Sequence, residues 1–234
     1  MNQPGVAQLT ISANASDNAS PIVMPAVLFL HFLERASELH LLGLKSYGIF
    51  LSCHDVERYE FRPTEVYFCD SQKNRRNEPE HRAQFEAQGA YFRRYDDAGF
   101  VADARELLQL QKSTRRSGHL LVGLFHSHRR QPANFSLIDY KLHNPLFSWH
   151  LVLSMRDPIH PQVQPFVIDK SLEDYGIDAT DVVEDEGEMQ YVGPEVRPTS
   201  LIVEGCQPEL EEVKIVLSYN KFCESLHSKR MLAD

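Results

Sequence analysis

The chain has 234 residues, of which 42% are hydrophobic and 24% are charged, and its formal net charge is −9. This composition is ordinary for a globular protein, and the length suffices for one large domain or for one domain with sizeable additions. It excludes a disordered or fibrous protein for the bulk of the chain. Because an acidic protein repels phosphate backbones, we also expect no nucleic-acid partner.

The compartment is indicated by the first residues and by the cysteines. The amino end lacks the basic start and apolar stretch of a signal peptide, and no run approaches the ~18 apolar residues of a membrane span. The four cysteines, at positions 53, 69, 206 and 223, are too far apart for a thiolate zinc clamp or a redox pair. We therefore expect reduced thiols, no membrane association and a cytoplasmic location.

The amino-terminal half is predicted to contain a leader, a helix and two strands. Residues 1–20 show neither the helical nor the strand spacing of apolar residues and are expected to be a flexible leader, although the stretch AQLTISA could add an edge strand. Apolar residues at helical spacing predict a first helix over residues 24–40, with Pro25 in its first turn. Short β-rich runs then predict strands over residues 47–53 and 65–70.

A second helix and two buried strands are expected in the middle of the chain. Helical periodicity over residues 100–118 ends at Gly118. The runs HLLVGLF, residues 119–125, and WHLVLSM, residues 149–155, are nearly continuously apolar, which is typical of strands buried on both faces. Between these two strands lies the segment HSHRRQPANFSLID, whose end FSLID is expected to begin a helix.

The carboxyl-terminal part is predicted to hold two strands and a closing helix. Strands are expected over residues 163–169 and 199–205, and the helix over residues 208–232. The acidic residues 173–188 are nearly free of large apolar side chains and are expected to form a flexible surface insertion. Because helices and strands interleave throughout, the class is α/β or α+β, with a mixed central β-sheet flanked by helices.

The most informative positions are two histidines separated by one residue. His126 and His128 follow a buried strand, and side chains in extended chain alternate, so both rings are expected on the same side. Asp139 lies in the predicted first helical turn after Ser136, a plausible helix cap, and the helix would return it over the same edge. Two imidazoles and a carboxylate, with a fourth position for water, are a ligand set that catalytic zinc uses.

The spacing of these residues resembles the motif of the JAMM metalloprotease family, also called MPN or JAB. His126, Ser127 and His128 are followed by seven residues, then Ser136, two more residues and Asp139. The order of predicted elements also resembles that family over about residues 25–169. The resemblance implies a cytidine-deaminase-like architecture and a division into a leader (1–20), a zinc domain (21–170) and a carboxyl-terminal extension (171–234) with an acidic loop, a strand and a terminal helix.

Carried over to this chain, the resemblance implies a zinc-dependent hydrolase of amide bonds. His126, His128 and Asp139 would hold Zn²⁺, and the Ser136 hydroxyl would help to hold the oxyanion or the bound water. The substrate would be a protein or peptide, commonly an isopeptide link or the carboxyl-terminal tail of a ubiquitin-like protein. A carboxylate base would transfer the proton, and a homodimer or another partner protein could bind through the helices.

Two positions depart from the family pattern. The family glutamate lies three residues before the glycine that opens the first core strand, and counting back from Gly48 gives Lys45. A lysine cation cannot act as a carboxylate base, so the base is unknown. Arg129 stands where the family usually has proline. The candidates to replace the base are Glu34, Glu38, Glu57, Glu60 and Glu65.

Two classes of function therefore remain open. Retention of all three ligand residues and Ser136 favours a hydrolase, whereas Lys45 favours a catalytically impaired MPN scaffold that binds metal and assembles with partners. A deaminase-like or nuclease-like zinc site is disfavoured, because the deaminase pattern requires Cys-x-x-Cys with its own glutamate, and the sequence has neither.

Overall fold

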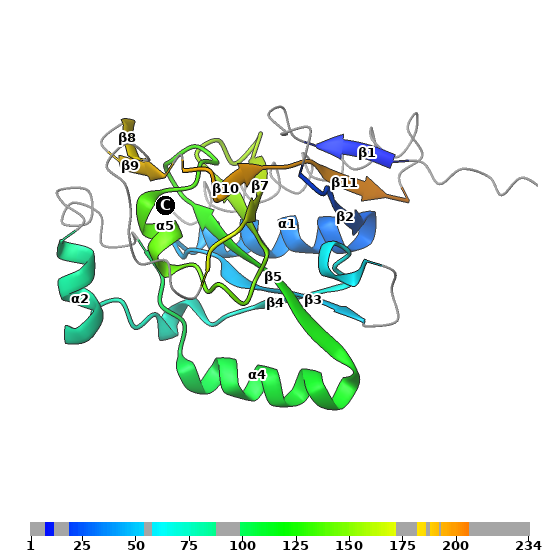
Figure 1. Cartoon of the computed structure of the whole chain (residues 1–234), viewed down its shortest axis with the longest axis horizontal. Coiled ribbons are helices and arrows are strands. Elements are labelled where there is room, and N and C mark those ends of the chain that lie inside the picture. Colours follow the sequence, from blue (N-terminus) through cyan, green and yellow to red (C-terminus); the bar gives the residue numbers. More distant parts are fainter. Residues whose placement is uncertain are drawn as a thin grey trace, which may run out of the picture.

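The fold is described from a computed structural model, which describes residues 8–11, 19–53, 58–87, 99–171, 182–185, 188–191 and 193–205. Most strands belong to one central sheet, and helices cover its two faces (Figure 1). The helices are α1 (Ala26–Leu41), α2 (Pro79–Glu86), α4 (Ala104–Ser117) and α5 (Leu137–Leu142), with 3-10 turns at Tyr59–Phe61 and Ser71–Lys73. The strands are β1 (Gln8–Ile11), β2 (Ile22–Pro25), β3 (Tyr47–Cys53), β4 (Glu65–Phe68), β5 (His119–His128), β6 (Trp149–Ser154), β7 (Gln162–Ile168), β8 (Val182–Asp185), β9 (Glu188–Tyr191), β10 (Val196–Pro198) and β11 (Leu201–Glu204).

The central sheet has six strands in the order β10-β7-β6-β5-β3-β4. Its one parallel pair is β5 with β6, and all its other neighbours are antiparallel. A parallel connection needs a crossover, which here runs through the loop after β5 and through α5. The predicted mixed sheet flanked by helices is confirmed, and the crossover leaves the sheet at the carboxyl end of β5.

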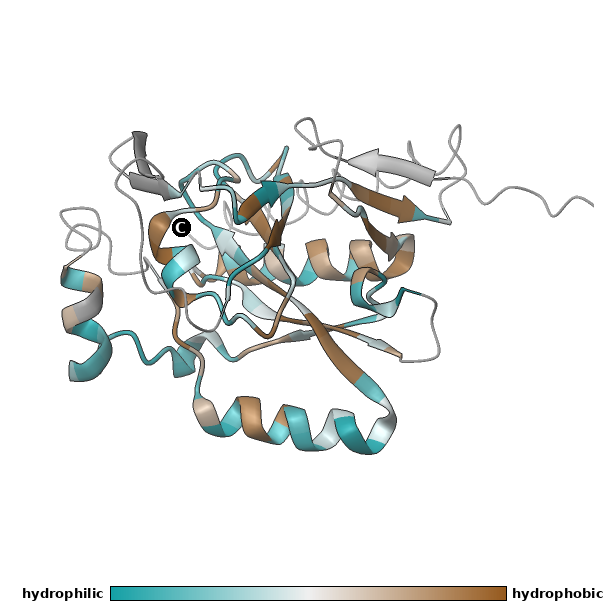
Figure 2. Ribbon diagram, in the orientation of Figure 1, coloured by the Kyte–Doolittle hydropathy of each residue, from teal (hydrophilic) through white to brown (hydrophobic). Residues whose placement is uncertain are grey.

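A large apolar core joins α1 to one face of the sheet. Phe32 of α1 packs its ring against Phe50 and Phe125, with centroids 5.5 and 5.0 Å apart, and Trp149 stacks on Phe50 at 5.2 Å. The hydropathy colouring shows this apolar interior along the strands and α1 (Figure 2). These rings fix the positions of β3, β5 and β6 relative to one another.

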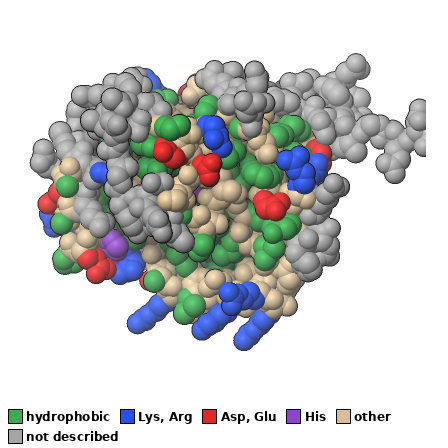
Figure 3. Space-filling model, in the orientation of Figure 1, with side chains coloured by type: hydrophobic (Ala, Val, Ile, Leu, Met, Phe, Trp, Pro, Cys, Tyr) green, Lys and Arg blue, Asp and Glu red, His purple; other side chains and the backbone are tan. Residues whose placement is uncertain are grey.

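Helix α4 covers part of the opposite face. Its first turn is capped by the Asp103 carboxylate, which accepts from the N–H groups of Arg105 and Glu106, and it ends at Gly118 with φ 73°. Leu110 packs with Ile49 and Leu124 of the sheet. The outer side carries basic residues, seen as a row of blue side chains along the lower edge (Figure 3). This amphipathic pattern explains why the predicted second helix forms here.

The predicted start of the first helix is wrong by two residues. Met24 and Pro25 belong to strand β2, and the helix begins at Ala26. A residue that precedes proline is disfavoured in the helical conformation, because the proline ring clashes with its backbone. Met24 therefore stays extended, and its side chain is fully buried in the core.

Segments outside the resemblance also contribute to the fold. The stretch AQLTISA contains β1, which pairs with β11 at the edge of a three-stranded sheet of order β1-β11-β2. Leu201 and Val203 of β11 are fully buried in the main core. Strand β10 extends the central sheet. Residues 171–234, predicted as an extension, thus supply both core side chains and a sheet edge.

Part of the acidic stretch 173–188 differs from its prediction. Strands β8 and β9 form an antiparallel hairpin that begins at Val182, so these residues have regular structure where a flexible insertion was expected. The remainder of the acidic stretch, the closing helix predicted over residues 208–232 and most of the leader lie outside the described residues. Within the part that the structure describes, no helix is long and apolar enough to cross a membrane.

Candidate metal centre

The register of β3 against β5 fixes the geometry of the site. Gly48 pairs with Phe125, and a Cβ atom at Gly48 would lie only 2.0 Å from the Tyr67 carbonyl oxygen, so no side chain fits there. Beyond the strand, the Ser127 N–H donates to the Ser46 carbonyl (2.8 Å), and the Ser46 N–H donates to Ser127 Oγ (2.7 Å). Ser127, the residue between the two histidines, thus attaches the segment before Gly48 to the end of β5.

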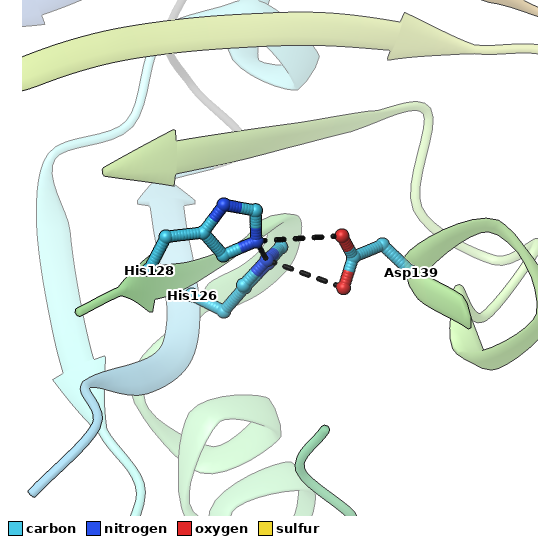
Figure 4. A group of neighbouring side chains, drawn as sticks. All are labelled: His126, His128 and Asp139. Atoms are coloured by element: carbon cyan, nitrogen blue, oxygen red, sulfur yellow. Dashed lines mark hydrogen bonds and ion pairs between the residues drawn. The ribbon is translucent and has the colours of Figure 1, made fainter. Parts of the chain in front are cut away.

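His126 and His128 are the last residues of β5 to project from one face of the sheet. Both belong to the strand itself, as predicted, and it continues three residues past the apolar run HLLVGLF. They are 6% and 4% exposed, and their Nε2 atoms are 2.9 Å apart. Figure 4 shows both rings turned toward Asp139, which comes from the start of α5. The predicted projection of both rings to the same side is confirmed.

Asp139 is held by the amino end of its own helix. Ser136 is the N-cap of α5, and its Oγ accepts a hydrogen bond from the Asp139 N–H (3.2 Å). In return, Asp139 Oδ2 accepts from the Ser136 N–H (2.9 Å) and from the Ser136 hydroxyl (2.6 Å). This reciprocal capping box fixes the carboxylate. The predicted cap is confirmed, whereas contact of this hydroxyl with an oxyanion stays a prediction.

The three predicted ligand residues lie at distances suited to one metal ion. Asp139 Oδ1 lies 3.2 Å from His126 Nε2, and Asp139 Oδ2 lies 3.6 Å from His128 Nε2. Around a tetrahedral zinc with ligand bonds of about 2.0 to 2.1 Å, two ligand atoms are about 3.3 Å apart. The observed separations of 2.9 to 3.6 Å bracket that value. One ligand atom from each residue lies within 4.8 Å of the others, so the three residues fit a zinc ion.

The protonation states favour a cation. Burial lowers the pKa of His126 and outweighs the opposing effect of Asp139, which favours the neutral ring. Burial raises the pKa of Asp139, but the adjacent His126 and His128 rings outweigh it and hold the carboxyl pKa well below its usual value. Metal binding requires neutral imidazoles and ionised carboxylates, and both of these pKa shifts favour those forms.

Two more histidines lie behind the predicted ligands. His150, on β6, places its Nε2 atom 2.7 Å from His126 Nδ1, and His143, at the end of α5, places its Nδ1 atom 3.2 Å from His150 Nδ1. Neither residue was predicted from the sequence to belong to the site. Two signals were present: His150 interrupts the apolar run WHLVLSM, and His143 follows Asp139 by four residues, so both lie on one face of α5.

A small cavity opens beside His126 and Asp139. Its volume is about 30 Å³, enough for a water molecule. Apolar walls come from Phe100, Leu124 and Leu142, together with Gly99. The polar side chains that line it are those of Lys45, Tyr47, His126, Asp139, His143 and His150. Burial raises the pKa of Tyr47, so this hydroxyl stays protonated.

Lys45 occupies the position where the resemblance implies a glutamate. It lines the cavity, and its positive charge acts on His126. The Ser71 hydroxyl donates to the Lys45 carbonyl, which fixes the backbone there. Gly48 is fixed in the sheet, so the residue three positions before it is also fixed relative to the site. That residue is Lys45, as the sequence predicted.

The proposed substitutes for the base lie elsewhere. Glu34 and Glu60 are exposed. Glu38 pairs with Arg35 at 2.7 Å, and Glu65 pairs with His119 at the opposite end of β5. Glu57 lies outside the described residues. Among the residues that the structure describes, Asp139 is the one carboxylate that lines the cavity.

Comparison with known proteins gives a family match. The family described as prokaryotic homologs of the JAB domain matches residues 48–166, slightly more than half of the chain. A solved structure from Desulfitobacterium hafniense is 23% identical, with a TM-score of 0.45, over 63% of this chain and 84% of the other. One from Salinibacter ruber is 17% identical, with a TM-score of 0.40, over 72% of this chain and 99% of the other. No curated protein matches the chain.

The matched segment runs from Gly48 to Phe166 and includes His126, His128, Ser136 and Asp139. It also spans β3 through most of β7, which is the part of the sheet that carries the site. Lys45 lies just before it. This chain therefore belongs to the family of prokaryotic JAB-domain homologs.

Proposed function

We propose that this protein is a zinc-dependent hydrolase of amide bonds. The observation that carries the proposal is the convergence of His126, His128 and Asp139: the two Nε2 atoms are 2.9 Å apart, and one ligand atom from each residue lies within 4.8 Å of the others. Two imidazoles and one carboxylate with an open fourth position form a catalytic zinc set, because a purely structural site closes all four positions. The proposed substrate is a protein or peptide, such as the carboxyl-terminal tail of a ubiquitin-like protein.

The chain's own residues would hold and orient the ion. Asp139 uses Oδ2 to accept two hydrogen bonds from Ser136, which leaves Oδ1 as the better ligand atom. The His128 Nδ1–H donates to the Pro132 carbonyl at 2.8 Å, so its Nε2 carries a lone pair. When bound, a zinc ion lowers the pKa of a coordinated water from 15.7 to about 7 and polarises the scissile carbonyl.

Proton transfer is the step for which the site is poorly equipped. A lysine cation cannot accept a proton, and loss of a positioned base typically costs about 10²- to 10⁴-fold in rate. With Lys45 in the cavity, we expect hydrolysis to be slow. The ammonium group is suited to an anionic group of the substrate near the scissile amide.

Lys45 also supports a second candidate function, a metal-binding scaffold that assembles with partners. Such a protein would use the ion for structure and its helices for contact, as a homodimer or with another protein. Exposed apolar side chains at both ends of α1, Val27 (80%) and Leu42 (71%), are consistent with this use. We also propose a cytoplasmic location, where the described cysteines, Cys53 and Cys69, would stay reduced.

The test combines metal content with cleavage. The purified full chain should hold one equivalent of zinc and should slowly cleave fusions to ubiquitin-like proteins or short peptide amides, and a chelator should abolish the cleavage. Zinc binding without any cleavage, by the wild type or by Lys45→Glu, would favour the scaffold. A chain that binds no zinc would end the hydrolase proposal.

A further inference from the structure

Four buried imidazoles form one continuous series through the site. Their nitrogen atoms meet in the order His128, His126, His150 and His143, at successive distances of 2.9, 2.7 and 3.2 Å. All four rings are at most 6% exposed. The rings come from β5, from β6 and from the end of α5, so the series connects the elements that supply the ligands.

Both ends of the series are anchored by carbonyl oxygens, which only accept hydrogen bonds. His128 Nδ1 lies 2.8 Å from the Pro132 oxygen, and His143 Nε2 lies 2.8 Å from the Phe147 oxygen. Each of these nitrogens must therefore carry a proton. A ring that binds a metal ion, or that accepts a hydrogen bond, has a lone pair on its other nitrogen, and here these nitrogens are His128 Nε2 and His143 Nδ1, which face inward along the series.

The orientation of the inner rings follows from the His143 end of the series. If His143 Nδ1 accepts, the donor across the 3.2 Å contact is His150 Nδ1, and His150 Nε2 then accepts from His126 Nδ1 across the 2.7 Å contact. This arrangement leaves His126 Nε2 and His128 Nε2 with lone pairs that face each other and the Asp139 carboxylate, whose oxygens lie 3.2 and 3.6 Å away. A cation at this point would be bound by both lone pairs and by the carboxylate.

We propose that His150 and His143 are positioning residues that hold His126 in the tautomer whose Nε2 can bind a metal ion. In this arrangement the His126 Nδ1–H donates to His150 Nε2, and the His150 Nδ1–H donates to His143 Nδ1. The inference rests on the proposed metal site and adds its outer partners. An outer hydrogen bond of this kind orients a ligand ring and raises its basicity.

Aromatic packing shields one side of the outer rings. Phe135 makes edge-to-face contacts with His150 and His143, with centroids 5.2 and 6.3 Å apart. Because Phe135 is 2% exposed, its ring shields this side of the series. His143 is the C-cap of α5, four residues after Asp139, and its N–H donates to the Asp139 carbonyl at 2.8 Å. The series therefore couples the His126 ring to the helix that supplies the carboxylate.

The tautomers can be read directly in the zinc-loaded chain. Long-range proton–nitrogen correlation spectra of the imidazole rings should show Nδ1–H for His126, His128 and His150, and Nε2–H for His143. This measurement does not depend on any substrate. A zinc-loaded chain with the proton of His150 on Nε2, or with that of His143 on Nδ1, would overturn the proposal.

Zinc affinity tests the role of the series. His150→Leu removes the acceptor for the His126 Nδ1–H and should weaken zinc binding about 10- to 100-fold in a competitive chelator titration. His150→Gln keeps one acceptor and one donor and should recover most of that loss. Leu151→Ala is the matched control, because Leu151 is fully buried on the same strand but projects to the opposite face.

The outcomes separate this inference from the proposed function. If Leu151→Ala weakens zinc binding as much as His150→Leu at a similar loss of melting temperature, the effect is general destabilisation and the positioning role is wrong. If the wild type binds zinc and His150→Leu binds it equally well, the positioning role fails alone and the hydrolase proposal stands. A wild type that binds no zinc would end both.

Discussion

The Ser136 hydroxyl donates a hydrogen bond of 2.6 Å to Asp139 Oδ2, and Ser136 Oγ accepts one of 3.2 Å from the Asp139 N–H. One pair of residues thus starts helix α5 and orients the carboxylate that faces the two histidines. Stability and metal binding are coupled here, because the cap and the ligand belong to the same turn.

Ser136→Ala should therefore have two effects. Loss of the cap should lower the free energy of unfolding by about 1 kcal/mol in chemical denaturation. Loss of the bond to Oδ2 should weaken zinc binding about 10-fold or more, because the carboxylate is no longer oriented. Ser136→Thr, which can still cap, should retain most of both properties. An alanine variant that binds zinc as tightly as the wild type would show that the hydroxyl does not position Asp139.

Removal of a proposed ligand should remove the metal. We expect His126→Ala and Asp139→Ala to lose the one equivalent of zinc found in the wild type, as measured by elemental analysis after dialysis. His119→Ala is the control, because His119 lies at the other end of the same strand, where its Nε2 contacts Glu65 at 3.0 Å. Full zinc content in the Asp139 variant would exclude this carboxylate as a ligand.

Lys45→Glu should convert a slow hydrolase into a faster one. The substitution places a proton acceptor in the cavity beside His126, and a positioned base typically contributes about 10²- to 10⁴-fold in rate. The measurement is the chelator-sensitive cleavage rate of a peptide amide or a ubiquitin-like fusion. Lys45→Gln, which removes the charge without adding a base, should not reproduce the gain. Equal gains in both variants would attribute the effect to the lost charge.

Lys170 closes the other end of α5. Its Nζ donates to the carbonyls of Tyr140, Lys141 and His143 at 2.7, 3.2 and 3.1 Å, which are groups that a helix leaves without partners at its carboxyl end. Lys170→Met should lower the free energy of unfolding by about 1 to 3 kcal/mol. Lys112→Met, on the exposed side of α4, should have little effect in the same denaturation experiment. A similar small effect for both would mean that the carbonyls are satisfied by water instead.

Acid should destabilise the metal-free chain through His143. Burial lowers the pKa of this ring to about 4, whereas an unfolded histidine titrates near 6.5. Between these pH values the unfolded chain binds more protons, so stability is present above pH ~6.5 and is lost as the pH falls toward about 4. The full contribution is about 3 kcal/mol.

The measurement is the free energy of unfolding at several pH values with a chelator present. His143→Phe should flatten the decline over this window, provided that the variant folds, and His160→Ala should leave it unchanged, because the His160 side chain is 77% exposed. Burial also lowers the pKa of His150 well below its usual value, so His150 contributes to the loss of stability in acid in the same direction. A slope in His143→Phe equal to that of the wild type would exclude His143 as the source.

The sequence by itself determined the elements and the candidate ligands. The spacing of apolar residues and the local composition predicted the strands β3, β5 and β6 and the helix α4. Both properties depend on residues within a few positions of one another. The spacing of His126, His128 and Asp139 predicted that their side chains converge, and it did so for the same reason. Two of them share a strand face, and the third lies in the first turn of the next helix.

Only the tertiary structure decided what surrounds these residues. Lys45 is beside His126 because β3 pairs with β5 in a register fixed at Gly48, and His150 lies behind His126 because β6 is the parallel neighbour of β5. Met24 belongs to a strand because β2 pairs with β11, about 180 residues away in the sequence, whereas Pro25 explains only why Met24 is not helical. Such contacts join segments that carry no local signal for one another, so their consequences became visible only when the sheet brought them together.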